Sequence, residues 1–260
     1  MARVIAVANQ KGGVGKTTTS VNLAASLAAI KRSVLLIDLD PQGNATMGSG
    51  VDKREVEKSC YDILMDESTI ADAVLVLPDV GYDLLPSNAD LTAAEIGLID
   101  QLGRELRLRQ AIESVREKYT YVIIDCPPAL SMLTINALVA ADSVMIPTQC
   151  EYYALEGLSA LLETFEKIKK ILNPNLVVEG FLRTMYDPRN NLANQVSQQL
   201  LKHFGDKVYR TIIPRNVRLA EAPSHGLPAL LYDKSSSGAV AYLALAGEML
   251  RRDEAALAAN

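Results

Sequence analysis

The sequence has little of what marks a secreted or membrane-bound protein. Three cysteines stand among 260 residues, and no two of them form a CxxC pair. They are too few and too scattered for a disulfide framework or a zinc site. No apolar run reaches the roughly 18 residues that a membrane-spanning helix needs, and the apolar start of the chain is too short for a signal peptide. These absences predict a cytoplasmic protein with free, buried thiols.

The chain also lacks an excess of positive charge, with 26 Lys and Arg against 31 Asp and Glu. The protein as a whole is therefore not expected to bind polyanions. Residues 183–218 are the exception, because they carry a net charge of +5 and leave −10 for the remainder. The basic residues of this segment are Arg183, Arg189, Lys202, Lys207, Arg210, Arg215 and Arg218. Such a segment is either an ordinary solvated face or a surface for an acidic partner.

Short runs rich in Val, Ile and Leu alternate with longer helical stretches along the whole chain. Continuous apolar runs are typical of parallel strands covered on both faces. The pattern predicts one α/β domain over residues 1–260, a single doubly wound, mostly parallel sheet with helices on both faces. The predicted strands are Val4–Ala8, Val34–Asp38, Tyr82–Leu85, Tyr121–Asp125, Ser143–Pro147, Val178–Thr184 and Val208–Ile213. The predicted helices are Thr17–Ala29, Thr92–Lys118, Ala154–Leu172, Leu192–Phe204 and Gly238–Arg252. For Thr46–Pro78 we expect a surface insertion of short helices without chemistry of its own.

The clearest motif, KGGVGKTT, follows the first predicted strand and opens the first predicted helix. Its glycines let backbone N–H groups turn toward phosphate oxygens, and the helix N-terminus favours negative charge there. Lys16 is placed to reach the β- and γ-phosphates, and Thr17 to coordinate Mg²⁺. An incidental glycine-rich turn would not need this strand–loop–helix context. The predicted nucleotide-binding residues of the loop are Lys11, Gly12, Gly13, Val14, Gly15, Lys16, Thr17 and Thr18.

The loop departs from the pattern G-x-x-x-x-G-K-[ST] in two ways. Gln10 stands where the pattern has its first glycine, and Lys11 adds a second lysine. A loop that cradles phosphate needs small residues and free amides, so this lysine is not a requirement of the fold. Its charge predicts a second contact with phosphate, which a neighbouring subunit could hold.

Two of the predicted strands end in aspartate, at Asp38 and Asp125, and Asp40 follows two residues after the first. In an open parallel sheet the ligand lies beyond the carboxyl ends of the strands, where these side chains could converge on the loop. A lone aspartate after a strand is usually a turn residue. Two such ends in a chain with a phosphate-binding loop favour roles in holding a metal or orienting water.

These stretches together resemble the ParA/Soj family of partitioning ATPases, within the deviant P-loop group that also includes MinD. The resemblance extends along most of the chain through KGGVGKTT, DLDPQGN, DCPP with LTINAL, TMYDPRNNLANQV and IPRNVRLAEAPSHG. The last two stretches are long and specific. The resemblance implies a P-loop ATPase with ATP and Mg²⁺ as cofactors, whose ATP hydrolysis is weak until a ParB-type centromere-binding partner stimulates it.

The resemblance implies catalytic roles for three residues. Lys11 corresponds to the signature lysine that reaches the nucleotide of the partner subunit in an ATP-dependent sandwich homodimer. Lys16 corresponds to the P-loop lysine, and Asp40 to the residue that orients or activates the attacking water. Gly12 lies where packing of the dimer requires a very small residue.

The resemblance also implies the groups around the metal and the base. Asp125 corresponds to the Walker B aspartate, and with Thr17 and Asp38 it makes up the expected Mg²⁺ site. Pro214 and Asn216 lie in the stretch that contacts adenine in relatives.

For the basic segment the resemblance implies that Arg189 and Arg218 bind double-stranded DNA non-specifically across the ATP-bound dimer. Phosphate contacts add through counterion release, so doubling a modest patch can switch DNA binding on. No pattern of base readout is present, and no sequence specificity is expected. We therefore expect a nucleoid-associated cytoplasmic protein that segregates a chromosome or a plasmid.

Four alternatives remain to be weighed. A membrane-associated regulator like MinD needs a basic amphipathic helix at its C-terminus, whereas residues 239–260 are rich in alanine and mixed in charge. A carrier of metal clusters needs paired cysteines, and a biotin-pathway type of ligase needs a carboxylate-substrate pocket. The sequence gives no indication of either the paired cysteines or such a pocket. Related ATPases that position other cargoes share the same switch and stay open.

Overall fold

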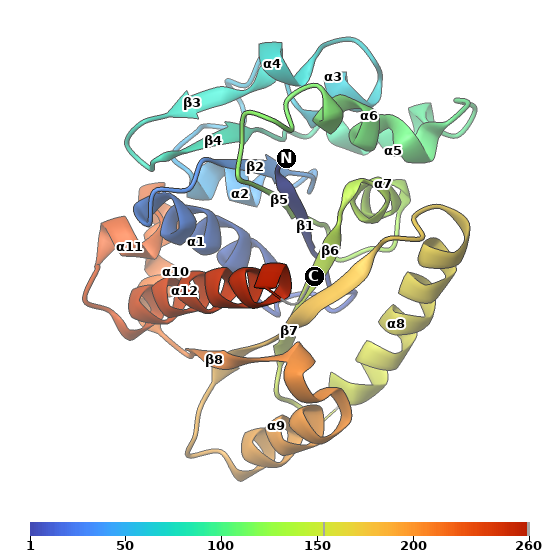
Figure 1. Ribbon diagram of the computed structural model, residues 1–260. Coiled ribbons are helices and arrows are strands. Elements are labelled where there is room, and N and C mark those ends of the chain that lie inside the picture. Colours follow the sequence, from blue (N-terminus) through green and yellow to red (C-terminus); the bar gives the residue numbers. More distant parts are fainter. Residues whose placement is uncertain (153, 259–260) are drawn as a thin grey trace.

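The computed structural model describes residues 1–152 and 154–258. Eight strands form one sheet in the order β3-β4-β2-β5-β1-β6-β7-β8 (Figure 1). All neighbouring strands run parallel except β3 and β4. The strands are β1 (Arg3–Val7), β2 (Val34–Asp38), β3 (Leu75–Leu77), β4 (Tyr82–Leu85), β5 (Tyr121–Asp125), β6 (Ser143–Gln149), β7 (Val177–Tyr186) and β8 (Val208–Pro214). The predicted fold class, a doubly wound, mostly parallel sheet, is confirmed.

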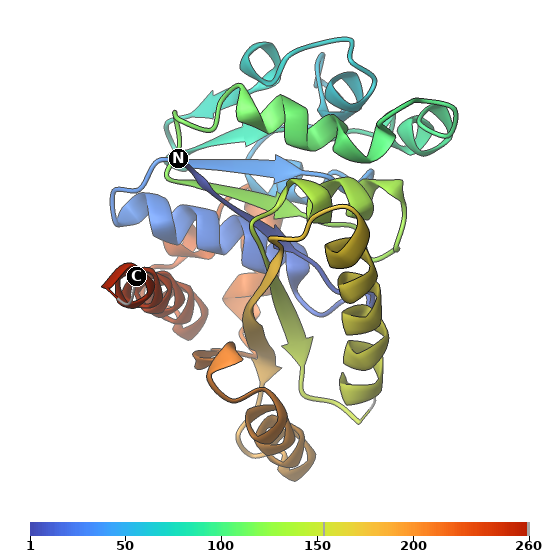
Figure 2. The same ribbon diagram turned by 45° about the vertical axis from the view of Figure 1, so that its right-hand side comes forward.

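Helices cover both faces of the sheet, because successive side chains of a strand point to opposite faces. In β1, Val4 and Ala6 belong to one buried apolar cluster, and Ile5 and Val7 to the other. Figure 2 shows α1 and α12 on one side of the strands, with α7 and α8 on the other. The first side holds α1 (Lys16–Ala29), α2 (Asn44–Gly48), α10 (Val217–Glu221), α11 (Ala229–Tyr232) and α12 (Ser237–Ala258). The second holds α3 (Cys60–Leu64), α4 (Ile70–Ala73), α5 (Leu91–Gly97), α6 (Arg107–Glu113), α7 (Met132–Ala140), α8 (Ala154–Ile171) and α9 (Asn191–Phe204).

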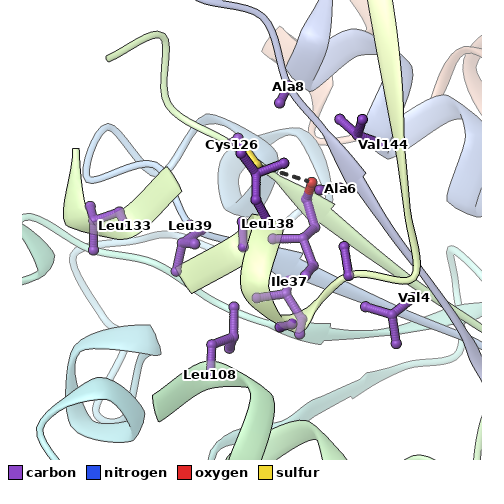
Figure 3. Packing of buried hydrophobic residues seen from close by; sticks show 14 of the residues in the cluster. Val4, Ala6, Ala8, Ile37, Leu39, Leu108, Cys126, Leu133, Leu138 and Val144 are labelled. Carbon is purple, nitrogen blue, oxygen red and sulfur yellow. Dashed lines mark hydrogen bonds between the residues drawn. The ribbon is translucent and has the colours of Figure 1, made fainter. Parts of the chain in front are cut away.

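The buried cluster on the second side joins the central strands to the helices that cover them. Figure 3 shows Ala6 of β1 and Ile37 of β2 beside Leu138 of α7, with Leu108 of α6 below them. Cys126 belongs to the same cluster, and burial raises the pKa of its thiol well above the usual range. All three cysteines are buried and free, as expected for a protein without disulfides.

The helix predicted over Thr92–Lys118 is wrong as a single element. The structure divides it into α5, the 3₁₀ turn η1 (Arg104–Leu106) and α6. Gly103 has a left-handed φ of +67°, which no continuous right-handed helix can contain. The elements that were not predicted from the sequence include α7, β3, α10 and α11. Most of α7 is buried, so it shows no polar face, and β3 has three residues.

Strand β8 forms one edge of the sheet, and α12 covers part of that edge. The backbone N–H groups of Arg210 and Thr211 donate to the two oxygens of Glu248, at 2.9 and 2.8 Å. Arg252 donates to Glu248 at 2.9 Å and to the carbonyl oxygen of Val208 at 3.1 Å. Glu248 is 6 % exposed. The carboxylate therefore takes the place that a further strand would occupy.

Replacing Glu248 by alanine is expected to lower the free energy of unfolding by about 1–3 kcal/mol, because two backbone N–H groups of β8 and the Arg252 guanidinium lose their acceptor. Chemical denaturation measures this loss. Glu248→Gln keeps one acceptor oxygen and should lose less, and Glu254→Ala, on the exposed side of the same helix, should lose almost nothing. Equal stabilities for Glu248→Ala and Glu254→Ala would contradict the role of the carboxylate.

Candidate nucleotide site

The loop after β1 has the backbone that the glycines predict. Gly13 and Gly15 have φ angles of +72° and +88°, in the left-handed region that favours glycine. Gly15 stands at the N-cap of α1, where the first N–H groups of the helix have no side-chain cap. These groups and the positive end of the helix favour a bound anion. The loop therefore has the geometry of a phosphate-binding site.

The side chains of the two lysines of this loop differ in burial and in their partners. Lys16 is 7 % exposed, and its Nζ donates to the carbonyl oxygen of Lys11 at 3.2 Å. Burial lowers the pKa of Lys16, and the nearby carboxylates of Asp125 and Asp40 oppose that shift. The side chain of Lys11 is 44 % exposed and forms an ion pair with Glu151. Lys16 thus belongs to the interior of the site, whereas Lys11 faces outward.

The start of α1 is tied to the end of β5 through one carboxylate. Thr17 Oγ1 donates to Asp125 Oδ2 at 2.7 Å, and Ser20 Oγ donates to Asp125 Oδ1 at 2.8 Å. Burial raises the pKa of Asp125, nearby Asp38 raises it further, and the two hydroxyl donors act in the opposite direction. Hydroxyl and carboxylate oxygens are the ligands that Mg²⁺ prefers. Thr17 and Asp125 therefore fit a Mg²⁺ site beside the phosphates.

Asp38 and Asp40 lie at the end of β2 in different environments. Asp38 Oδ2 accepts from the N–H and the hydroxyl of Thr46 at 2.7 Å each, and Oδ1 accepts from the N–H of Asp40 at 3.2 Å. Burial raises the pKa of Asp38. Among the residues that the structure describes, no three His, Cys, Asp or Glu side chains form a group that could hold a metal. Direct ligation of Mg²⁺ by Asp38 stays a prediction; its Oδ1 holds the Asp40 loop and its Oδ2 holds Thr46 of α2.

Two cavities adjoin this loop. The larger, of about 650 Å³, is lined by Gly12, Gly13, Gly15, Lys16, Thr17, Thr18, Asp40, Pro41, Gln42, Asn44, Thr92, Pro128 and Met185. The smaller, of about 190 Å³, is lined by Gly15, Thr18, Thr184, Met185, Ile213, Pro214, Arg215, Asn216, Leu219, Ala220 and Tyr242. Gly15, Thr18 and Met185 line both, so the two cavities adjoin. One ligand with an anionic end and a flat, less polar end could occupy the pair.

The two arginines predicted to bind DNA lie outside these cavities. Arg189 precedes α9, its side chain is 88 % exposed, and it pairs with Asp187 at 2.8 Å. Hydrogen bonds from Arg189 lower the pKa of Asp187 to about 2. Arg218 is half exposed on α10 and pairs with Glu221 and Asp233. Both guanidinium groups are accessible, and each shares its charge with a carboxylate.

One residue of the basic segment is not at the surface. Arg183 is 6 % exposed, and its guanidinium donates to Ser197 Oγ at 2.9 Å and to the carbonyl oxygen of Tyr209 at 2.8 Å. It joins β7 to α9 and β8. The surface charge of residues 183–218 is therefore smaller than the count from the sequence.

Several supporting residues were missed by the sequence analysis. Thr46 holds Asp38, although no chemistry was expected from its segment. Thr184 Oγ1 donates to the carbonyl oxygen of Val14 at 2.8 Å and ties β7 to the loop. Ser20, four residues after the P-loop lysine, could have been found from helical spacing alone.

Comparisons with known proteins agree with this geometry. A family model described as an AAA domain matches residues 2–178. The sporulation initiation inhibitor protein Soj of Bacillus subtilis is 56 % identical over 96 % of this chain and 98 % of its own length. The chromosome partitioning protein ParA of Caulobacter vibrioides is 51 % identical over 96 % and 95 %. The chain belongs to the ParA/Soj family.

The structure of this ParA/Soj protein also superposes on a solved one. Cobyrinic acid a,c-diamide synthase from Mycobacterium smegmatis, crystallised with ADP and magnesium, matches with a TM-score of 0.86 and 38 % identity over 98 % of this chain and 96 % of that one. The resemblance inferred from the sequence is thus confirmed for the family and the fold. None of the described helices of this ParA/Soj protein is long and apolar enough to cross a membrane.

Proposed function

We propose that this protein is an ATP-dependent switch for DNA partition. ATP binding assembles a sandwich homodimer that binds DNA without sequence preference, and a ParB-type partner stimulates ATP hydrolysis and release from the nucleoid. The observation that carries the proposal is the pair of adjoining cavities, with Lys16, Thr17 and Asp40 on one and Pro214 and Asn216 on the other. High identity to Soj and ParA supports the role in partition.

The residues present fit ATP with Mg²⁺. The small cavity would take the adenine beside Pro214 and Asn216, and the loop amides with Lys16 would hold the phosphates. Thr17 and Asp125 would hold the metal, which when bound neutralises charge developing on the phosphates. The ADP and magnesium in the crystal of the synthase support this assignment.

Asp40 is the candidate for orienting the attacking water. It lines the large cavity, and the N–H of Gln42 donates to its carboxylate at 2.9 Å, which limits its rotation. Lys16 is the cationic side chain among the described residues that line this cavity. Because Lys16 and Mg²⁺ would act there without a second cationic side chain on the transferred phosphate, we expect slow turnover by the isolated chain.

The second cation would come from another subunit. Lys11 faces outward, and its ion pair with Glu151 is exposed, so it can be exchanged for a contact with phosphate on a partner. Dimerisation also places two copies of Arg189 and Arg218 on one assembly. Contacts to DNA phosphates add through counterion release, so DNA affinity should rise when the dimer forms.

The direct test is binding to a random-sequence duplex with a non-hydrolysable ATP analogue and with ADP, across a salt series. We expect the DNA affinity with the analogue to be about 10-fold or more above that with ADP. The logarithm of this affinity should fall linearly with the logarithm of the salt concentration. A second duplex of unrelated sequence should bind with the same affinity. Fluorescence anisotropy measures all three. Equal, weak binding with both nucleotides would leave the nucleotide site standing and contradict the DNA switch.

A further inference from the structure

Met185, near the end of β7, has an unusual backbone conformation. Its φ is +49°, in the left-handed region where an L-residue with a side chain is strained. Such residues persist where the surroundings hold them, and they concentrate at ligand sites and switch regions. The neighbours of Met185 therefore indicate what its strain serves.

On one side, Met185 contacts the nucleotide site. Its side chain lines both the large and the small cavity. Its Cε lies 3.8 Å from the position that a Cβ on Gly15 would take. The preceding Thr184 is bonded to the loop carbonyl of Val14 at 2.8 Å. A ligand that extends from one cavity into the other would lie beside Met185, Gly15 and Thr18, which line both.

On the other side, Met185 leads directly into the loop that carries Arg189. The carbonyl oxygen of the next residue, Tyr186, accepts from the N–H of Arg215 at 3.2 Å, and its hydroxyl donates to Asn194 of α9. Asp187 and Arg189 follow, joined by their ion pair. The direction of this loop thus depends on the backbone at the end of β7.

We propose that Met185 is a positioning residue that transmits occupancy of the nucleotide site to residues 187–190. A ligand across both cavities displaces the Met185 side chain. The φ angle of Met185 then changes, and the loop that carries Arg189 turns with it. This inference rests on the proposed nucleotide binding and adds the route from that site to the DNA surface.

Hydrogen exchange of the backbone amides of Asp187, Arg189 and Asn190 tests this route without DNA, since Pro188 has no N–H. In the unaltered protein, adding the ATP analogue should change their exchange rates about 5-fold or more. Met185→Ala, which removes the contact with the ligand, should abolish that change when it is compared at saturating analogue, with the analogue's affinity measured separately. Met185→Leu keeps the volume of the side chain and should retain the change in exchange rates. Met47→Ala, a partly exposed methionine on α2, is the matched control and should behave as the unaltered protein.

Glycine at this position provides a second variant that keeps the fold. Because glycine adopts a φ of +49° without strain, Met185→Gly removes the side chain without imposing a strained backbone, and it should still lose the exchange response. A response in Met185→Ala and Met185→Gly equal to that of the unaltered protein would overturn the inference. So would an unaltered protein that binds the analogue without any change at 187–190.

A DNA measurement then separates this inference from the proposed function. We expect Met185→Ala to reduce the ratio of DNA affinities with the ATP analogue and with ADP about 5-fold or more, with the ADP value unchanged. If the exchange response is present and depends on Met185 but DNA affinity ignores the nucleotide, the DNA switch fails and the role of Met185 stands. An unchanged affinity ratio in a protein that does switch would contradict that role.

Discussion

Replacing Lys16 by alanine is expected to reduce ATP hydrolysis by about 100-fold or more, because the variant loses the cation that faces the transferred phosphate. Lys16 is 7 % exposed and sits inside the loop, so water cannot supply an equivalent charge at that place. The carboxylates of Asp125 and Asp40, which act on the pKa of Lys16, would remain without it. Their uncompensated charge would oppose binding of the triphosphate as well as its hydrolysis. Phosphate release under single-turnover conditions, with nucleotide affinity measured separately, distinguishes the two effects.

Lys11→Ala provides the informative contrast. Its side chain is half exposed and points toward Glu151, so the monomer should bind ATP nearly as well as the unaltered protein. What it should lose is dimerisation with ATP, measured by sedimentation, and with it hydrolysis by the assembled dimer. Lys170→Ala, an exposed lysine at the end of α8, is the control for loss of a charge and should change neither. Equal losses of nucleotide affinity in Lys11→Ala and Lys16→Ala would contradict the division of roles between the two lysines.

The parts of this site that the sequence predicts are those encoded locally. KGGVGKTT specifies a turn whose positive φ angles only glycine accepts easily, so Gly13 and Gly15 could be placed without a structure. The strands that end in Asp38 and Asp125 are continuous apolar runs, and both start and end where predicted. The glycine turn and the two strands are thus determined by residues that are adjacent in the sequence.

The parts that the sequence does not predict depend on distant contacts. Thr184 meets Val14 from 170 positions away, and Met185 lines both cavities because the end of β7 lies beside the loop. The role of Thr46 is hidden in a segment of irregular composition, since only the fold brings Ser87 and Asp38 to its hydroxyl. The sequence pattern therefore locates the phosphate-binding loop, but it does not show which distant residues support that loop and its aspartates.

Charge reversal of Arg189 and Arg218 is expected to abolish DNA binding by the ATP-bound protein and to leave nucleotide binding intact. Both side chains are accessible, at 88 % and 50 % exposure, and neither lines the nucleotide cavities. Replacing both by alanine removes two phosphate contacts per protomer, so the slope of log affinity against log salt should fall by about 2 per protomer. Replacing both by glutamate adds repulsion, and the affinity at low salt should fall about 100-fold or more.

The chain offers a closely matched control in another part of the molecule. Arg54 is 80 % exposed and binds Asp52 through its backbone N–H, Nε and Nη2, in the same Asp-x-Arg arrangement that joins Arg189 to Asp187. It lies before α3, whereas Arg189 precedes α9 at the opposite end of the sheet (Figure 1).

Arg54→Glu with Lys58→Glu changes the net charge by as much as the test pair does. General electrostatics would weaken DNA binding equally in both double variants, whereas a defined surface would make only the Arg189 and Arg218 pair sensitive. Anisotropy with a random duplex and the ATP analogue, at two salt concentrations, separates these outcomes. Equal losses in the two pairs would show that the acidic chain binds DNA only through its overall charge, and the assignment of Arg189 and Arg218 would then be wrong.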